Sequence, residues 1–290
     1  MTHTSPHSAP GGAQHTAFEH DLGSDGQAEI LDLDAEVFAE HLASITAWLP
    51  VDRDPRHIAD LGCGTGAGTF ALLARFPGAE VTAVDASDGH LGRLRKRAEA
   101  LGVADRVRTV RADLDGDWPE LDRPELVWAS ASMHHLADPD RALREVRALL
   151  APGGLFAVVE TAGFPRFLPV NAPEGRPGLE ERCHAALAHH AAAHVPHRGA
   201  DWGTKLASAG FTVEDERAIT VNVDGSRGTA VGRYALSSLK HLRDSAAPAL
   251  SAEDLVALDQ LLDTDSPLGV LRRGDLAVRT ERTVWAARRA

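Results

Sequence analysis

The stretch ADLGCGTGAGTF, residues 59–70, places four glycines directly behind a short apolar run. Glycine has no Cβ, so it adopts positive φ readily and lets the backbone approach a ligand closely. A turn of this composition between a strand and a helix usually holds a nucleotide-like cofactor. The stretch therefore predicts a strand–turn–helix unit with a ligand over the turn, and it leaves open which ligand.

The segments that follow alternate between short apolar runs and longer helical patterns. Strands are expected within 56–62, 80–87, 106–115, 125–136 and 154–160, with helices within 68–78, 88–103 and 138–154. The last of these helices begins with Asp138 and Pro139, which are typical of a helix N-terminus, and ends at a Pro-Gly-Gly stop. This alternation predicts βαβ units and an α/β fold with a mostly parallel, Rossmann-like sheet of seven strands flanked by helices.

The same pattern predicts how the chain is divided. We expect a disordered tail over 1–25, a helical segment over 26–56 and a cofactor-binding core over 57–160. A Pro- and Gly-rich loop and a helix form an insertion over 161–205. Residues 206–290 add the final strands of the same domain and a second helical insertion near 229–265. Parallel sheets bind ligands beyond the carboxyl ends of their strands, so we expect the insertions to form a lid there, with surface decoration as the alternative.

Composition limits the class of partner. A net charge of -12 argues against binding to nucleic acid, which needs clustered Lys and Arg. Two cysteines, Cys63 and Cys183, are too few for a disulfide framework and favour a reducing cytoplasm. No apolar run is long enough to cross a bilayer, and the first residues lack the pattern of a signal peptide. We therefore expect a cytoplasmic protein with a small-molecule partner, as a monomer or a homodimer.

The glycine turn alone fits two cofactors. Residues 62–67 satisfy G-x-G-x-x-A, and Asp85 lies near the spacing of a ribose-binding acid, which is compatible with a nicotinamide dinucleotide or with an adenosine that has no pyrophosphate. Asp60 favours the second, because a carboxylate just before the turn would repel a pyrophosphate and attract a cationic group. S-adenosylmethionine carries an ammonium and a sulfonium and has no phosphate.

With these residues in place, the sequence resembles class I S-adenosylmethionine-dependent methyltransferases, in particular those that act on small molecules. ADLGCGTG at 59–66 resembles the first motif of that family, Asp85 the second, ADL at 112–114 the adenine motif and LLAPGG the turn before the fifth strand. The resemblance implies S-adenosylmethionine as methyl donor, S-adenosylhomocysteine as product and an O, N or C acceptor. It places a set of residues at the cofactor: Asp60, Gly62, Cys63, Gly64, Gly66, Asp85, Ala86, Asp113, Leu114 and Ser130.

His134 and His135 follow the fourth strand, where an acceptor should approach, so either is a candidate general base. The alternative is that one of them packs over the cofactor or caps the next helix. Acceptor contacts are expected from Phe164, Arg166, Phe167 and Trp202, with Arg166 suited to a carboxylate or phosphate; packing of the lid is the alternative for the two phenylalanines.

A histidine-rich segment, 184–197, has His190 and His194 one helical turn apart, but no carboxylate completes a metal site, and we expect no metal. Two other functions remain open. One is a nicotinamide-dependent oxidoreductase, which the G-x-G-x-x-A match supports. The other is a protein of the same fold that binds S-adenosylmethionine without methylating. The Ala-, Arg- and Gly-rich composition is typical of bacteria with high genomic G+C content, and it suggests a role in secondary metabolism.

Overall fold

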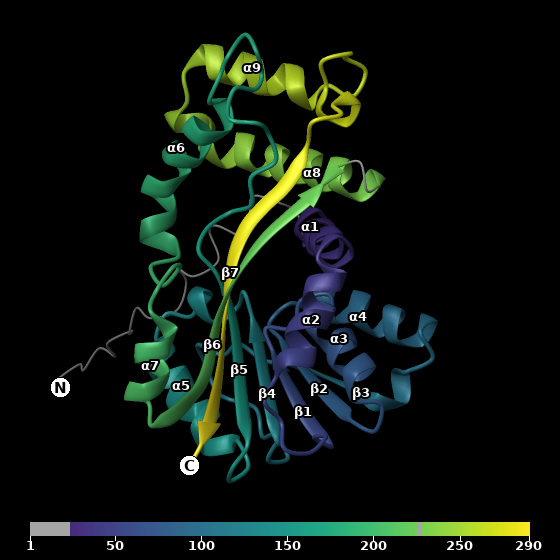
Figure 1. Ribbon diagram of the computed structural model, residues 1–290, viewed down its shortest axis with the longest axis vertical. Helices are drawn as coiled ribbons and strands as arrows, with labels where there is room; N and C mark the ends of the chain where they lie inside the picture. Colours follow the sequence, from purple (N-terminus) through teal and green to yellow (C-terminus); the bar gives the residue numbers. More distant parts are fainter. Residues whose placement is uncertain (1–23, 226–227) are drawn as a thin grey trace, which may run out of the picture.

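A computed structural model describes residues 24–225 and 228–290, with the side chains of all of these except 24–25 and 188–194. One seven-stranded sheet runs through the molecule in the order β3-β2-β1-β4-β5-β7-β6 (Figure 1). The strands are β1 His57–Leu61, β2 Glu80–Asp85, β3 Val107–Arg111, β4 Leu126–Ser130, β5 Leu155–Thr161, β6 Phe211–Asp224 and β7 Ala277–Arg289. β1 to β5 are parallel, and β7 lies antiparallel to both β5 and β6. The predicted fold class is confirmed.

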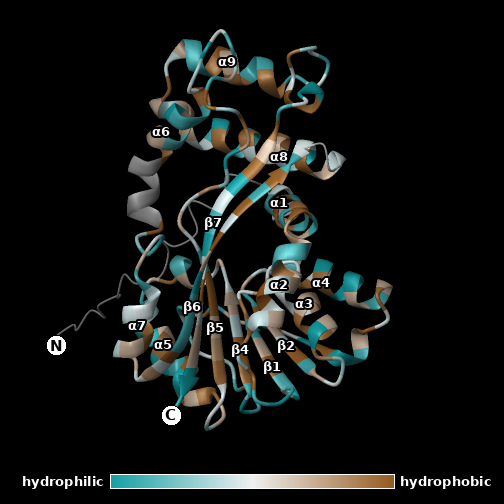
Figure 2. Ribbon diagram, viewed as in Figure 1, coloured by the Kyte–Doolittle hydropathy of each residue, from teal (hydrophilic) through white to brown (hydrophobic). Residues whose placement is uncertain are grey.

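Helices cover both faces of the sheet because the central strands are apolar on both sides (Figure 2). On one face, α2 Ala39–Trp48 and α3 Ala67–Arg75 bury Ile45 and Leu72 against Trp128, while α4 Asp88–Ala100 packs beside β2. On the other face, α5 Pro139–Leu149 and α7 Trp202–Ser208 pack against Val127 and its neighbours. Asp138 caps α5 by accepting a hydrogen bond from the Arg141 amide at 2.8 Å, with Pro139 at the first helical position, as expected from the sequence.

The remaining helices form what we call the cap: α1 Ser24–Val37, α6 Leu179–His194, α8 Thr229–Ala246 and α9 Ala252–Leu262. Figure 1 shows the cap beyond the carboxyl ends of the parallel strands, reached by the long antiparallel pair of β6 and β7. It has its own apolar core, in which Phe38, Phe167 and Tyr234 meet edge to face. The two expected helical insertions thus lie together over the edge of the sheet that binds ligands.

Short 3-10 segments complete the described elements: η1 Ala104–Arg106, η2 Met133–His135, η4 Ala247–Ala249 and η5 Val270–Arg272. The strand expected within 125–136 ends at Ser130, because Ala131 takes a left-handed conformation with φ 51° and η2 follows. The helical segment expected over 26–56 is divided into α1 and α2 at Phe38. The expected tail, 1–25, lies outside the described residues up to residue 23, and α1 already begins at Ser24. Among the described helices, none is long and apolar enough to span a membrane.

Close packing at the first turn of α3 generates a prediction. A Cβ on Gly68 would lie 2.5 Å from Trp128 Nε1 and 3.1 Å from Asp60 Oδ2, in a buried site with no room for it. We expect Gly68→Ala to lower the free energy of unfolding by about 1–3 kcal/mol, as overpacked cores do, despite the better helix propensity of alanine. A Cβ on Gly78 would meet nothing within 4 Å, so Gly78→Ala is the matched control and should unfold like the wild type in urea. Equal midpoints for the two variants would contradict this packing account.

Candidate functional site

The glycine turn after β1 is held in place by hydrogen bonds that its backbone amides donate. The amides of Gly62 and Cys63 donate to the Val84 carbonyl at 2.8 and 3.0 Å, which ties the turn to the end of β2. Gly62, Gly64 and Gly66 all have positive φ, and a Cβ on Gly62 would lie 2.4 Å from Cβ of Ser132. These positions therefore require glycine. The turn presents its backbone at the carboxyl edge of the sheet, as the sequence predicts.

Asp85 is the polar anchor of this turn. Its Oδ2 accepts the Gly64 amide at 2.8 Å, its Oδ1 accepts the Ser87 amide at 2.8 Å, and His90 Nδ1 lies 3.3 Å from Oδ1. Burial opposes ionisation of Asp85, but these hydrogen bonds outweigh it and hold the pKa of Asp85 below its usual value. Asp85 is therefore an ionised carboxylate next to the turn, with acceptor capacity left for a ligand hydroxyl, since a carboxylate accepts about four hydrogen bonds.

Asp60 lies underneath the turn. It is buried, and its Oδ2 accepts a hydrogen bond from the Thr69 hydroxyl at 2.6 Å across the start of α3. Burial raises the pKa of Asp60 to about 7, and the hydrogen bonds from Thr69 offset this only in part. Through Thr69, Asp60 links β1 to the start of α3. Its contact with a ligand ammonium remains a prediction.

Cys63 and Thr65 lie within the same turn and are both buried. Burial, with the charges of Asp60 and Asp85, raises the pKa of the Cys63 thiol well above its usual value, so this cysteine is not an activated nucleophile. The Thr65 hydroxyl is buried without a hydrogen-bond partner among the described residues. A buried hydroxyl of this kind is an unused polar group directly at the turn.

The other predicted cofactor residues line the same edge of the sheet. Asp113 is exposed after β3, where its Oδ1 accepts the Asp115 amide at 3.0 Å, and Leu114 beside it is 8% exposed. Ala86 is exposed after β2, and Ser130 is half-buried at the end of β4. A Cβ on Gly64 would lie 3.2 Å from the side chain of Leu31, so α1 of the cap covers the turn.

The two candidate bases differ in what surrounds them. His134 is buried, its Nδ1 pairs with Glu160 Oε2, and its Nε2 lies 3.3 Å from Nη2 of Arg198. Because the carboxylate accepts and the guanidinium donates, Nδ1 carries the proton and Nε2 accepts. Both ring nitrogens of His134 are thus engaged, and neither faces a substrate.

His135 is exposed and lies against His134, with ring centroids 4.2 Å apart. Burial among protein atoms lowers the pKa of His135, and the charge of Arg198 lowers it further. The imidazole is therefore neutral near pH 7 and accessible from solvent.

The residues predicted to contact an acceptor separate in the structure. Phe164 is half-buried, and the guanidinium of Arg198 lies over its ring, with the guanidinium carbon 4.0 Å from the ring centroid. Arg166 pairs with Glu181 at 3.2 Å. Phe167 is 1% exposed in the cap core, and Trp202, the first residue of α7, is fully buried against the sheet. The last two side chains pack the interior and do not enter the site proposed below.

No group of three or more His, Cys, Asp or Glu side chains among those described could hold a metal ion. The side chains of His190 and His194 lie outside the described residues.

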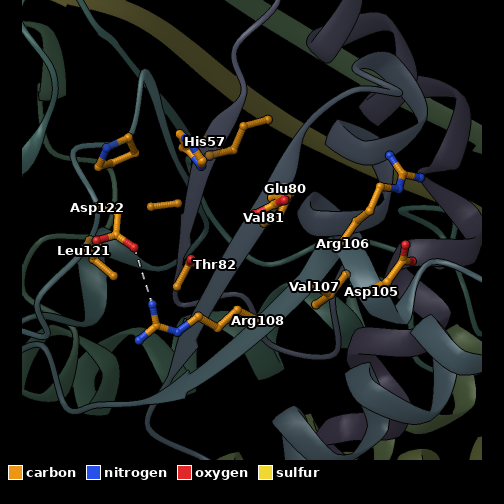
Figure 3. Close-up of a pocket in the computed structure, with 13 residues that line it drawn as sticks. His57, Glu80, Val81, Thr82, Asp105, Arg106, Val107, Arg108, Leu121 and Asp122 are labelled. Atoms are coloured by element: carbon orange, nitrogen blue, oxygen red, sulfur yellow. Dashed lines mark ion pairs between the residues drawn. The ribbon is translucent and has the colours of Figure 1, made fainter.

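A cavity of about 250 Å³ opens at the opposite edge of the sheet, where β1, β2 and β3 begin (Figure 3). Charged residues of both signs line it, and Arg108 and Asp122 approach each other there at 3.8 Å. Because parallel sheets bind ligands at the carboxyl ends of their strands, we do not assign the function to this cavity.

Comparison with known proteins agrees with the geometry at the carboxyl edge. Residues 59–156, from the glycine turn to β5, match the family model described as a methyltransferase domain. This part of the chain is thus similar to a methyltransferase domain. The chain is 39% identical over 104 residues to a trans-aconitate 2-methyltransferase of Acidovorax sp., a match that covers 36% of this chain and 38% of that relative. The likeness thus spans under two fifths of either chain.

Solved structures extend the likeness of fold to most of the chain. A protein of Bacillus halodurans, described as a methyltransferase, has a TM-score of 0.54 and 17% identity, over 86% of this chain and 98% of that one. A geranyl diphosphate methyltransferase in complex with SAM has a TM-score of 0.51 and 18% identity, over 90% of each chain. At such identities the comparison supports the fold alone.

Three residues at the site were not predicted from the sequence. Glu160 ends β5 as a buried carboxylate, and an acid closing an apolar strand is a signal that sequence reading can use. Arg198 and Leu31 carry no such signal, because only tertiary packing brings them to the carboxyl edge.

The pKa of Asp60 predicts how stability depends on pH. A carboxyl whose folded pKa lies at about 7, above its ordinary value of 3.8, stabilises the fold fully below pH 4 and loses that contribution as pH rises to 7. Asp60→Asn keeps an acceptor for Thr69 and removes this dependence. We expect the stability of Asp60→Asn relative to wild type to increase by about 2–3 kcal/mol between pH 5 and pH 8, measured by urea unfolding. Parallel curves for the two proteins would show that Asp60 does not titrate in this range.

Proposed function

We propose that this protein is an S-adenosylmethionine-dependent methyltransferase that acts on a small molecule. The observation that carries the proposal is the ionised Asp85, hydrogen-bonded to Gly64 at the carboxyl ends of β1 and β2. It combines a glycine-rich backbone with a carboxylate that has capacity left for a ribose hydroxyl. The methyltransferase-domain match over the same residues and the likeness to a fold solved with SAM support this interpretation.

The residues present fit this cofactor at three points. The turn 62–66 offers close backbone approach, and the buried hydroxyl of Thr65 lacks a partner there. Asp85 would accept from the ribose. Asp113 and Leu114, after β3, would contact the adenine amino group and ring. A pyrophosphate in this place would lie near the ionised carboxylate of Asp85, so the site suits a cofactor without phosphates better than a dinucleotide.

Bound there, S-adenosylmethionine would supply a methyl group activated by its sulfonium. The chain would contribute alignment and exclusion of water, which are the main demands of an in-line displacement. The cap lies over the carboxyl edge and α1 reaches the turn through Leu31, so a ligand at this edge would be enclosed. Enclosure and an acidic net charge favour a small acceptor.

Of the two histidines, His135 is the candidate base. Both nitrogens of His134 are engaged by Glu160 and Arg198, whereas His135 is accessible and uncharged near pH 7. Its lowered pKa makes it a weak base, which fits an acceptor that loses its proton easily.

The wider setting follows from composition alone. We place the reaction in the cytoplasm because the chain has two cysteines, both free and buried, and in bacterial secondary metabolism because of its Ala-, Arg- and Gly-rich composition.

Cofactor binding is tested first by calorimetry with S-adenosylmethionine, S-adenosylhomocysteine and NADH. We expect micromolar binding of the first two and none of NADH. Asp85→Ala should weaken binding by about 100-fold or more, because hydrogen bonds to a charged group contribute about 1.5–3 kcal/mol each and the anchor of Gly64 is lost as well. An acceptor screen then looks for the mass gain of one methyl group.

The control for Asp85 is Asp88→Asn, which removes a charge from the same helix start, where Asp88 is largely exposed and pairs with Arg111 at 3.0 Å. Its affinity should match the wild type. Binding of NADH alone would overturn the proposal, and unchanged affinity in Asp85→Ala would remove Asp85 from the site.

A further inference from the structure

Arg198 is a cation without a carboxylate partner at the carboxyl edge of the sheet. It lies in the loop between α6 of the cap and α7 of the core (Figure 1) and contacts His134, which follows β4. No acidic side chain among the described residues lies within ion-pair distance of its guanidinium, and its Nε is buried without a hydrogen-bond partner. Burial lowers the pKa of Arg198, and the charge of Glu160 only partly opposes this. A guanidinium remains charged in proteins, so this cation is poorly compensated.

Four partly buried arginines in and near the cap each have a carboxylate within 3.2 Å: Arg166 with Glu181, Arg176 with Glu253, Arg182 with Asp254, and Arg282 with Asp34. Arg279 of β7, also partly buried, donates instead to the Leu168 carbonyl. The contrast shows that the chain ordinarily neutralises an arginine in this region. Arg198 instead donates one hydrogen bond to the neutral imidazole of His134 and lies over the ring of Phe164.

Both contacts of Arg198 hold its position without neutralising it. Phe164 lies against the guanidinium, 4.0 Å from the ring centroid, and His134 accepts from Nη2 at 3.3 Å. His134 is itself fixed by Glu160, whose Oε1 accepts the amides of Met133 at 2.9 Å and His134 at 3.3 Å. With one planar face on Phe164 and one N–H on His134, Arg198 keeps further in-plane donors for a ligand.

Glu160 does not occupy the free donors of Arg198. Its side chain is 3% exposed, lies behind the His134 ring and is occupied by two backbone amides and Nδ1. It acts as a positioning residue for His134, and His134 for Arg198. The exposed neighbour of this relay is His135, the candidate base.

We infer that Arg198 binds a carboxylate of the methyl acceptor, so that the acceptor is a small carboxylic acid. The inference rests on the proposed function and adds the chemical class of the acceptor. It also moves the anion-binding role from Arg166, which is neutralised by Glu181, to Arg198. A carboxylate matches the planar donors of a guanidinium, and pairing in a partly desolvated site strengthens both hydrogen bonds.

The test compares acids with their neutral amides on the full chain saturated with S-adenosylhomocysteine. Acetate against acetamide, and benzoate against benzamide, differ in charge but hardly in shape, and calorimetry or NMR titration gives each dissociation constant. We expect at least one acid to bind about 10-fold or more tightly than its amide. Arg198→Gln should remove that preference while Arg198→Lys, which keeps the charge, retains part of it. Inorganic phosphate serves as a second anion and should bind more weakly than the preferred acid.

Arg243→Gln is the matched control, because Arg243 lies on α8 and pairs with Asp259 at 2.9 Å away from the site. It should keep the preference for acids. Equal binding of acid and amide for both pairs, a preference that survives in Arg198→Gln, or tighter binding of phosphate would each overturn the inference.

Binding of S-adenosylhomocysteine to wild type and to Arg198→Gln is measured in the same experiments. Its absence in the wild type would refute the proposed function. Its presence together with no preference for acids would refute the inference on Arg198 alone.

Discussion

The arrangement at the carboxyl edge depends on the carboxylate of Asp85. It binds the amide of Gly64 in the turn after β1 and the amide of Ser87 at the start of α4, so one side chain fixes the ends of two neighbouring strands and a helix. Glycines with positive φ leave the turn without side chains of its own to hold it. Without this anchor and the Val84 carbonyl, the turn would have no defined position over the sheet.

The cap is attached to this edge by a second carboxylate, the half-buried Asp34. Asp34 on α1 accepts from Tyr234 of α8 at 2.9 Å and from Arg282 of β7 at 2.8 Å, and Arg282 also lies 4.1 Å over the ring of Phe38. Three elements distant in sequence meet there. The long β6 and β7 carry the cap, and Asp34 sets where α1 lies, with Leu31 against Gly64. The geometry of the candidate acceptor site therefore depends on contacts outside residues 59–156, which match the methyltransferase-domain model.

Most of the fold could be predicted because the βαβ alternation is a local pattern with a strong physical cause. The strands before Asp85 and Ser130, the cap of α5 at Asp138 and the helical insertions all follow from apolar spacing and turn residues. The expected length of β4 was wrong, since the left-handed Ala131 that ends it has no sequence signal. Phe167 and Trp202, predicted to contact an acceptor, lie in the interior. The sequence does not distinguish an aromatic side chain that lines a pocket from one that packs a core.

The sequence by itself determined the parallel sheet, the glycine turn and the acids at the ends of β1 and β2 and after β3. These features depend on residues a few positions apart, and the physics of strands, turns and caps acts at that range. Only the tertiary structure decided which histidine is engaged, which arginine is left without a carboxylate and which helix covers the turn. The relay of Glu160, His134 and Arg198 joins β5, η2 and the loop before α7, and its members meet only when the cap packs on the sheet.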